Sequence, residues 1–283
     1  MRRPVWLGLC VVLALQAAAW HAAGAAPKAE LWPRWQAHDP ASQAIIDHDA
    51  WGSFLERYLV EGDDAVNRVA YAEVTAADRA ALNAYLEGLA AVPVSAQNRA
   101  EQMAYWINLY NALTLQVVLD HYPVDSIRDI NISPGLFSGL LNRGPWGKTL
   151  IEVEGEALSL DDVEHRILRP IWGDPRVHYA VNCASIGCPD LQSEPYRGAA
   201  IDAQLDAAAR DYVNDPRGVA VENGKLIVSS IYEWFKADFG GDDRGVIEHL
   251  QRYAAPALAA SLEPFPAIDD DRYDWRLNDA RAD

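Results

Sequence analysis

The distribution of helix and strand patterns along this chain of 283 residues predicts an α+β fold. Apolar side chains recur at helical spacing through the N-terminal half, whereas the alternation typical of strands is confined to residues 148–154, 177–182 and 219–228. Residues 95–121 are apolar on nearly every side, which is typical of a central, buried helix. Because the two kinds of element are segregated, we expect this helix to pack on a small antiparallel sheet.

Three helices are predicted in the N-terminal half. Residues 42–60 carry apolar side chains that share one broad face. Thr75, followed three residues later by Asp78, has the spacing of a capping box and predicts the start of a second helix. The third is the long central helix, for which Ser95 is the expected N-cap and Pro123 marks the end.

Shorter elements are predicted in the C-terminal half. Residues 148–154 have the alternation of a strand that turns at Gly155. Ser159 and Asp162 repeat the capping-box spacing and predict a helix that Pro170 ends. The other expected elements are a strand at 177–182, a helix at 199–213, a hairpin of residues 219–221 and 226–228, and short helices at 231–239 and 244–253.

Residues 1–25 have the features of a secretory signal peptide. Two arginines precede an apolar run at residues 5–15, and small residues with an Ala-x-Ala cleavage pattern follow. The run is shorter than the ~20 residues of a membrane-spanning helix, so we expect cleavage and no stable membrane span. The protein is then periplasmic or secreted. Residues 26–40 contain three prolines and are expected to form a loose leader to a single domain at residues 41–275.

Composition excludes several kinds of partner. Cleavage would remove two arginines and no acidic residue, which changes the net charge from −17 to −19. An acidic protein without a basic cluster repels nucleic acid, so we expect no nucleic-acid partner. A structural zinc site needs four ligands, but Cys183 and Cys188 with one histidine supply three, so no metal or other cofactor is expected. The composition predicts no particular oligomeric state.

Four segments give the chain its resemblance to a known family. They are residues 105–112 (YWINLYNA), 158–169 (LSLDDVEHRILR), 178–183 (HYAVNC) and the pair Cys188-Pro189. In their order and spacing they resemble the domain of unknown function 547 family of bacteria and plants, over residues 95–215. The resemblance implies a relation to papain-like and transglutaminase-like cysteine hydrolases. It therefore implies a peptidase or amidase that acts on a peptide or another small polar substrate.

The candidate catalytic residues implied by this resemblance lie in and before a cysteine-bearing turn. A cysteine hydrolase needs a thiolate, a histidine that takes its proton, a group that orients the histidine and an oxyanion donor. Cys183 is the expected nucleophile, and His178 and His165 are alternative bases. Glu164 and Asn108 complete the candidate catalytic set. The residues expected to bind substrate or support the site are Asn111, Trp106, Tyr110, Asn182, Arg169 and Cys188.

The same residues also allow a structural interpretation. In an oxidising compartment Cys183 and Cys188 can close a small disulfide, and a bonded cysteine cannot attack a substrate. Asn108 and Asn111 share one face of the central helix and can tie neighbouring backbone to it. Two hypotheses therefore stand: an exported cysteine hydrolase, or a non-catalytic binding or scaffold domain of the cell envelope with a structural disulfide.

Overall fold

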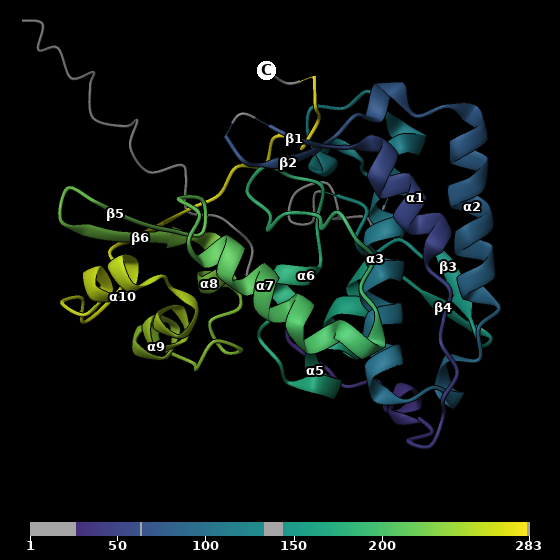
Figure 1. Cartoon of the computed structure of the whole chain (residues 1–283), viewed down its shortest axis with the longest axis horizontal. Coiled ribbons are helices and arrows are strands. Elements are labelled where there is room, and N and C mark those ends of the chain that lie inside the picture. The colour runs from purple at the N-terminus through teal and green to yellow at the C-terminus, as the bar shows by residue number, and fades with distance from the viewer. Residues whose placement is uncertain (1–26, 63, 133–143, 282–283) are drawn as a thin grey trace, which may run out of the picture.

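The computed structural model confirms the α+β class: among the described residues, helices occupy the middle of the molecule and three small sheets lie at its edges (Figure 1). The structure describes residues 27–62, 64–132 and 144–281. The predicted signal peptide, residues 1–25, lies outside the described residues. Within the described ranges, none of the helices has the length and apolar character needed to cross a membrane.

The elements fall into strands, helices and short helical turns. The strands are β1 (Leu59–Glu61), β2 (Asn67–Val69), β3 (Ile151–Val153), β4 (Glu156–Leu158), β5 (Val219–Glu222), β6 (Lys225–Ser229) and β7 (Asp270–Arg272). The helices are α1 (Asp49–Tyr58), α2 (Ala76–Ala90), α3 (Arg99–His121), α5 (Arg169–Trp172), α6 (Val177–Ala180), α7 (Ile201–Val213), α8 (Ser230–Trp234), α9 (Asp243–Tyr253) and α10 (Pro256–Leu262). The turns are η1 (Pro33–Gln36), η2 (Tyr71–Glu73), η3 (Val94–Ala96), η4 (Ile127–Asp129), η5 (Asp162–Leu168) and η6 (Gly198–Ala200), of which η5 is a π-helix.

The three sheets are small and separate. β1–β2 and β3–β4 are antiparallel hairpins, whereas β5–β6–β7 is a three-stranded sheet in which β7 runs parallel to β6. The predicted β5–β6 hairpin is confirmed, and it turns at Asn223 and Gly224, whose φ angles of 51° and 75° suit a two-residue turn. The sequence predicted neither β7 nor β1–β2, because strands of three residues are too short to show a period.

The central helix that the sequence predicted is α3. Most of its side chains are buried, and its main neighbours are α2, α7, η5 and η6 (Figure 1). It therefore packs chiefly among helical elements and not on one sheet. Its N-cap is Asn98, whose side chain accepts the Glu101 N–H at 3.0 Å, and not the predicted Ser95. Ser95 lies one turn earlier, in η3, where its N–H and hydroxyl donate to Glu154.

Residues 177–182 do not form the predicted strand. Residues 177–180 form the helix α6, and the chain becomes extended only at Val181. Asp174 starts the helical turn, because its side chain accepts the Arg176 N–H at 2.9 Å. All four residues of α6 are buried. A short run that is buried on every side carries no period that separates strand from helix, which is why the pattern misled the prediction.

The helix that follows β4 begins as predicted but does not end as predicted. Its capping box is confirmed, because Asp162 N–H donates to Ser159 Oγ at 3.1 Å and the Asp162 carboxylate accepts the Ser159 N–H at 3.0 Å. The helix then widens into η5 and continues through Pro170 as α5. Proline is tolerated there because it falls in the first turn of α5.

The π-helix η5 releases two backbone carbonyls. The Arg169 N–H donates to Glu164 O, five residues back, so His165 O loses the partner that it would have in an α-helix. Arg166 O also lacks that partner, because Pro170, four residues further on, has no N–H. A buried carbonyl needs a donor from elsewhere in the protein.

The segment expected to be a loose leader supplies these donors. The N–H groups of Glu30 and Trp32 donate to the two released carbonyls at 2.9 and 3.0 Å. Trp35, in η1, is 2% exposed, and its ring meets that of Trp106 of α3 edge-on at 5.0 Å. Residues 27–40 are therefore packed against the domain because the π-helix and a buried tryptophan hold them there.

Candidate functional site

The cysteine-bearing turn follows α6 and is closed by a disulfide between Cys183 and Cys188, whose Cα atoms are 6.3 Å apart. The Asn182 side chain accepts the Ala184 N–H and donates to Pro189 O, both at 2.8 Å. Ala184 has a φ of 56°, a left-handed conformation that a residue other than glycine keeps only where its surroundings hold it. The disulfide and the Asn182 amide together fix the two ends of the turn.

The turn is held against the C-terminal segment of the chain. Gly187 N–H donates to Asp274 O at 2.8 Å, and Ile186 N–H donates to Arg276 O at 2.9 Å. The two backbones approach so closely at Gly187 that a Cβ atom there would lie 2.7 Å from Asp274 N. Glycine is required at this position because it has no side chain, and the contact places Tyr273 over the disulfide.

Hydroxyl groups surround the two sulfur atoms. Tyr273 Oη lies 3.0 Å from Cys183 Sγ and donates to Cys188 Sγ at 3.1 Å. Ser185 Oγ lies 3.2 Å from Cys183 Sγ and 3.0 Å from Tyr273 Oη. The Cys183 N–H donates to Cys188 Sγ at 2.9 Å. Cys188 is 4% exposed, whereas Cys183 is partly exposed.

The His178 ring lies in a buried polar cluster. Its Nε2 is 2.8 Å from Asp238 Oδ2, its Nδ1 is 3.8 Å from Glu164 Oε1, and Phe235 stacks on it at 4.2 Å. Burial lowers the pKa of His178, against the opposing effect of Asp238 and Glu164. The ring is therefore neutral at pH 7. Because the Asp238 carboxylate can only accept, Nε2 carries the proton.

His165, the alternative base, lies in the same cluster. Arg169 donates to His165 Nδ1 at 3.1 Å, and Asp161 Oδ1 lies 3.7 Å from Nε2. Burial lowers the pKa of His165 to about 4 and raises the pKa of Asp161 to about 6. Arg169 also donates to Asp238 at 2.6 Å. We call Asp161, Glu164, His165, Arg169, His178 and Asp238 the buried charge cluster.

The buried charge cluster and the disulfide are adjacent but are not joined as a catalytic triad. The ring nitrogens of both histidines face acids or Arg169, and among the described residues neither imidazole hydrogen-bonds to a sulfur. Glu164 lies between the two rings, 3.7 Å from His165 Nδ1. Burial raises the pKa of Glu164, which also accepts a hydrogen bond from Tyr110. The predicted nucleophile and bases thus lie in two networks.

The predicted amides of α3 bind backbone. Asn108 donates to Tyr196 O at 2.7 Å and accepts the Tyr196 N–H at 3.0 Å. Asn111 donates to Ala180 O at 2.9 Å and accepts the Asn182 N–H at 2.8 Å. Asn111 thereby fixes the chain where it enters the turn, and Asn108 fixes it at Tyr196, beyond the turn; none of these bonds reaches a sulfur. Trp106 is 1% exposed and belongs to the apolar core.

Sequence reasoning missed four residues that contact the candidate site. Asp238 and Phe235 contact His178, and Tyr273 and Ser185 contact the sulfurs. Ser185 lies within the conspicuous turn and could have been named from its position there. The other three come from segments at least 50 residues further along the chain, and no local pattern connects them with the turn.

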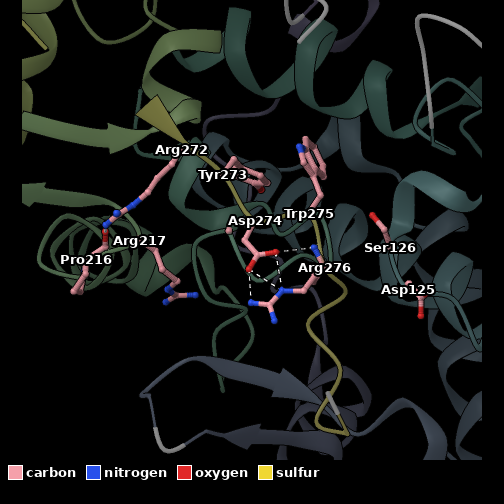
Figure 2. A pocket seen from close by; sticks show the side chains of 10 residues that line it. Asp125, Ser126, Pro216, Arg217, Arg272, Tyr273, Asp274, Trp275 and Arg276 are labelled. Carbon is pink, nitrogen blue, oxygen red and sulfur yellow. Dashed lines mark hydrogen bonds and ion pairs between the residues drawn. The ribbon is translucent and has the colours of Figure 1, made fainter. Parts of the chain in front are cut away.

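A surface cavity of about 780 Å³ opens beside the turn. Figure 2 shows Asp125 and Ser126 on one side of it, Arg217 and Arg272 on the other, and the Asp274–Arg276 pair between them. The residues that line it are Asp125, Ser126, Gly187, Pro216, Arg217, Arg272, Tyr273, Asp274, Trp275 and Arg276. We call it the arginine cavity. Gly187 and Tyr273 belong both to this lining and to the surroundings of the disulfide.

The three arginines of the cavity differ in the exposure of their side chains and in the acids that they bind. Arg217 is 16% exposed and binds Asp190 and Asp215. Arg272 and Arg276 are 45% and 72% exposed, and each has one acidic partner, Glu222 and Asp274 respectively. Only the last two arginines therefore present their guanidinium groups to solvent. In the part of the chain that the structure describes, no group of three or more His, Cys, Asp or Glu side chains is arranged to hold a metal ion.

Comparison with known proteins gives one match. A family model described as "Protein of unknown function, DUF547" matches residues 94–213, the stretch from η3 to the end of α7. The matched stretch contains α3, the cysteine turn and all of the buried charge cluster except Asp238. Neither the curated proteins nor the solved structures include a match to the chain.

Gly187→Ala tests the close contact between the turn and the C-terminal segment. Its Cβ would lie 2.7 Å from Asp274 N, so we expect the free energy of unfolding to fall by about 1–3 kcal/mol in urea denaturation. Gly88→Ala is the matched control, because nothing lies within 4 Å of its Cβ in α2, and we expect it to stabilise by about 0.5–1 kcal/mol. Equal effects of the two substitutions would contradict the close contact.

Asp161→Asn tests the charge states in the buried charge cluster. As pH falls below 6.5, the lowered pKa of His165 costs stability, because the unfolded chain takes up the proton first. The raised pKa of Asp161 has the opposite sign, because the folded protein takes up that proton first, below about pH 6. Without Asp161, the folded protein no longer gains the stability that offsets the loss caused by His165. Between pH 7 and 4.5 the variant should lose more stability than the wild type, by on the order of 1 kcal/mol.

The measurement is urea unfolding at a series of pH values. Glu263→Gln, at an exposed position after α10, serves as the control and should run parallel to the wild type. If Asp161→Asn also ran parallel to the wild type, the raised pKa of Asp161 would be wrong.

Proposed function

The chain contains a DUF547 family domain at residues 94–213, and from this premise we propose that the protein is an exported, non-catalytic binding protein of the cell envelope. The observation that carries this proposal is the pairing of Cys183 with Cys188 while both histidines are held by acids and Arg169. A sulfur in a disulfide cannot act as a nucleophile. The disulfide and the amide network then serve to hold the shape of a ligand site.

The arginine cavity is the proposed ligand site, and a short peptide is the proposed ligand. The exposed positive charges of Arg272 and Arg276 suit a terminal carboxylate, which would share Arg276 with Asp274, the acid that already binds its Nε and Nη2. The exposed Asp125, on the opposite side of the cavity, suits a terminal ammonium group (Figure 2). A volume of about 780 Å³ falls within the range of small-molecule sites. A zwitterionic peptide supplies both charges at once.

A cysteine hydrolase is the second candidate function. Cys183 is the more exposed of the two cysteines, so opening the disulfide would leave a thiol on the partly exposed residue of the turn. The negative charge of Glu164 acts on Tyr273, which connects the turn electrostatically with the buried charge cluster. One imidazole would have to leave its acidic partner to reach the thiol, so this function requires a rearrangement of the cluster.

Binding of trialanine tests the proposed function. By calorimetry on the protein without residues 1–25, we expect a dissociation constant of roughly 0.1–1 mM, as for a small ligand held by a few polar contacts. Arg276→Gln and amidation of the peptide carboxylate should each weaken binding about tenfold, because each removes one side of the same ion pair. Asp125→Asn should weaken binding of trialanine but not of its N-acetyl derivative.

Arg244→Gln is the matched control, because this arginine of α9 is 83% exposed and binds one acid, as Arg276 does. It should leave binding unchanged. The proposal fails if trialanine does not bind, or if blocked and unblocked peptides bind equally well.

Cys188→Ser separates the two candidate functions. This variant frees Cys183 without a reductant, whereas Cys183→Ser frees the buried sulfur. The binding proposal expects neither variant to hydrolyse a panel of peptide p-nitroanilides, because in the part of the chain that the structure describes no imidazole hydrogen-bonds to Cys183 Sγ. Turnover by Cys188→Ser together with no turnover by Cys183→Ser would establish the hydrolase in its place.

A further inference from the structure

We propose that Cys183–Cys188 is a directional thiol–disulfide exchange site, in which an exported dithiol reductant attacks Cys183 and Cys188 leaves as the thiolate. This inference concerns the chemistry of the turn and does not depend on peptide binding in the arginine cavity. Three observations carry it: the unequal exposure of the two cysteines, the backbone N–H that is aimed at Cys188 Sγ while the Tyr273 hydroxyl lies near both sulfurs, and the rigid frame of the turn.

Exposure selects the sulfur that is attacked. Cys188 is 4% exposed, whereas Cys183 is partly exposed. Exchange proceeds by attack of a thiolate on one sulfur of the disulfide, so access decides which sulfur reacts. A reductant that approaches from solvent therefore meets Cys183 first.

Hydrogen bonds select the sulfur that leaves. Cys188 Sγ accepts the Cys183 N–H at 2.9 Å and the Tyr273 hydroxyl at 3.1 Å. Burial raises the pKa of Tyr273, so its phenol remains a donor throughout the neutral range. Donors aimed at a sulfur stabilise it as a thiolate, and a more stable thiolate leaves faster. The nearby Arg217 also donates to Cys188 O, at 3.4 Å, but its charge is offset by two carboxylates.

The frame of the turn keeps these donors in place when the bond opens. Asn182 holds Ala184 and Pro189, and the backbone of Gly187 is bonded to Asp274. None of these contacts involves a sulfur atom. The donors to Cys188 are therefore preorganised by bonds that reduction does not break.

The exchange balances in two steps. In the first, the thiolate of the reductant forms a bond to Cys183 Sγ, the Cys183–Cys188 bond breaks, and Cys188 leaves with the electron pair. In the second, the other thiolate of the reductant attacks the mixed disulfide and releases Cys183 as a thiolate. The reductant is oxidised to a disulfide, the protein gains two electrons, and the cysteines take up protons according to their pKa values.

Trapping of the mixed disulfide tests the direction of attack. The oxidised protein without residues 1–25 is mixed with glutathione, a monothiol that has no second thiol of its own to resolve the mixed disulfide, and is quenched in acid before a second glutathione can react, then alkylated. Peptide mass mapping should find glutathione on Cys183 and the alkyl group on Cys188. Glutathione on Cys188, equal labelling of the two cysteines, or no reaction of the folded protein would each overturn the proposal.

Tyr273→Phe tests the role of the donor to the leaving group. It removes one hydrogen bond to the developing thiolate and should slow the opening by dithiothreitol about tenfold. Tyr85→Phe is the matched control, since it removes another buried tyrosine hydroxyl, which hydrogen-bonds to His48 at 2.6 Å. Opening at an unchanged rate in Tyr273→Phe would contradict the assigned role.

A second variant guards against a folding defect in Tyr273→Phe. Ser185→Ala removes a hydroxyl that approaches Cys183 and not Cys188, so it should slow the opening less than the tyrosine substitution does. Each rate is also measured in low concentrations of urea. A rate that rises in proportion to the unfolded fraction would mean that the disulfide reacts only in the unfolded chain, which would overturn the proposal.

Discussion

Two buried amide side chains on α3 hold the backbone on which the cysteine turn is built. Asn111 bridges Ala180 O and the Asn182 N–H, and Asn108 makes the same pair of bonds to Tyr196. Both amides are at most 2% exposed, so each bond replaces water that the backbone groups cannot reach. Loss of one partner would leave buried groups unpaired, at a cost of about 1–3 kcal/mol. The position of the turn, and with it the arginine cavity, therefore depends on the central helix.

A second constraint comes from one proline. Pro170 and the π-helix before it leave two carbonyls without helical partners, and the N-terminal segment satisfies both. The same segment reaches the buried charge cluster, because Arg169 donates to Pro27 O at 2.7 Å. The departure from α-helical register thus explains why residues far apart in the chain meet around His165. It also explains why these residues are packed although their composition is typical of a loop.

The sequence predicted those parts of the fold that local patterns determine. The capping boxes at Thr75 and Ser159, the central helix and the β5–β6 hairpin are confirmed, because each depends on residues within a few positions of one another. The strand at 177–182 was wrong, because a run buried on all sides has no distinguishing period. Tyr273 and Asp238 could not have been predicted at the site, because only the three-dimensional fold brings them to the turn and to His178.

For the candidate site, too, the sequence predicted residues but not the contacts that the three-dimensional fold creates. Family resemblance named the cysteines, the histidines, Glu164 and the two α3 amides. The structure places them in two adjoining networks around the end of α6, except for Asn108, which binds the backbone of Tyr196. The sequence did not predict which of these residues are in contact with one another. The Asp238 carboxylate, from the segment after α8, binds His178 Nε2, so this imidazole is engaged by an acid and not by a sulfur. Electrostatic partners, more than residue identity, thus decide between the two candidate functions.

The binding and exchange proposals both require that Cys183 and Cys188 are bonded to each other, and an intact-mass measurement tests this bond most directly. The protein is collected after export, denatured at once in iodoacetamide without a reductant, and weighed before and after reduction. The account expects no alkylation of the unreduced protein and addition of two alkyl groups after reduction. Two alkyl groups on the unreduced protein would show that both thiols are free, and would contradict the disulfide-held turn on which the binding and exchange proposals are built.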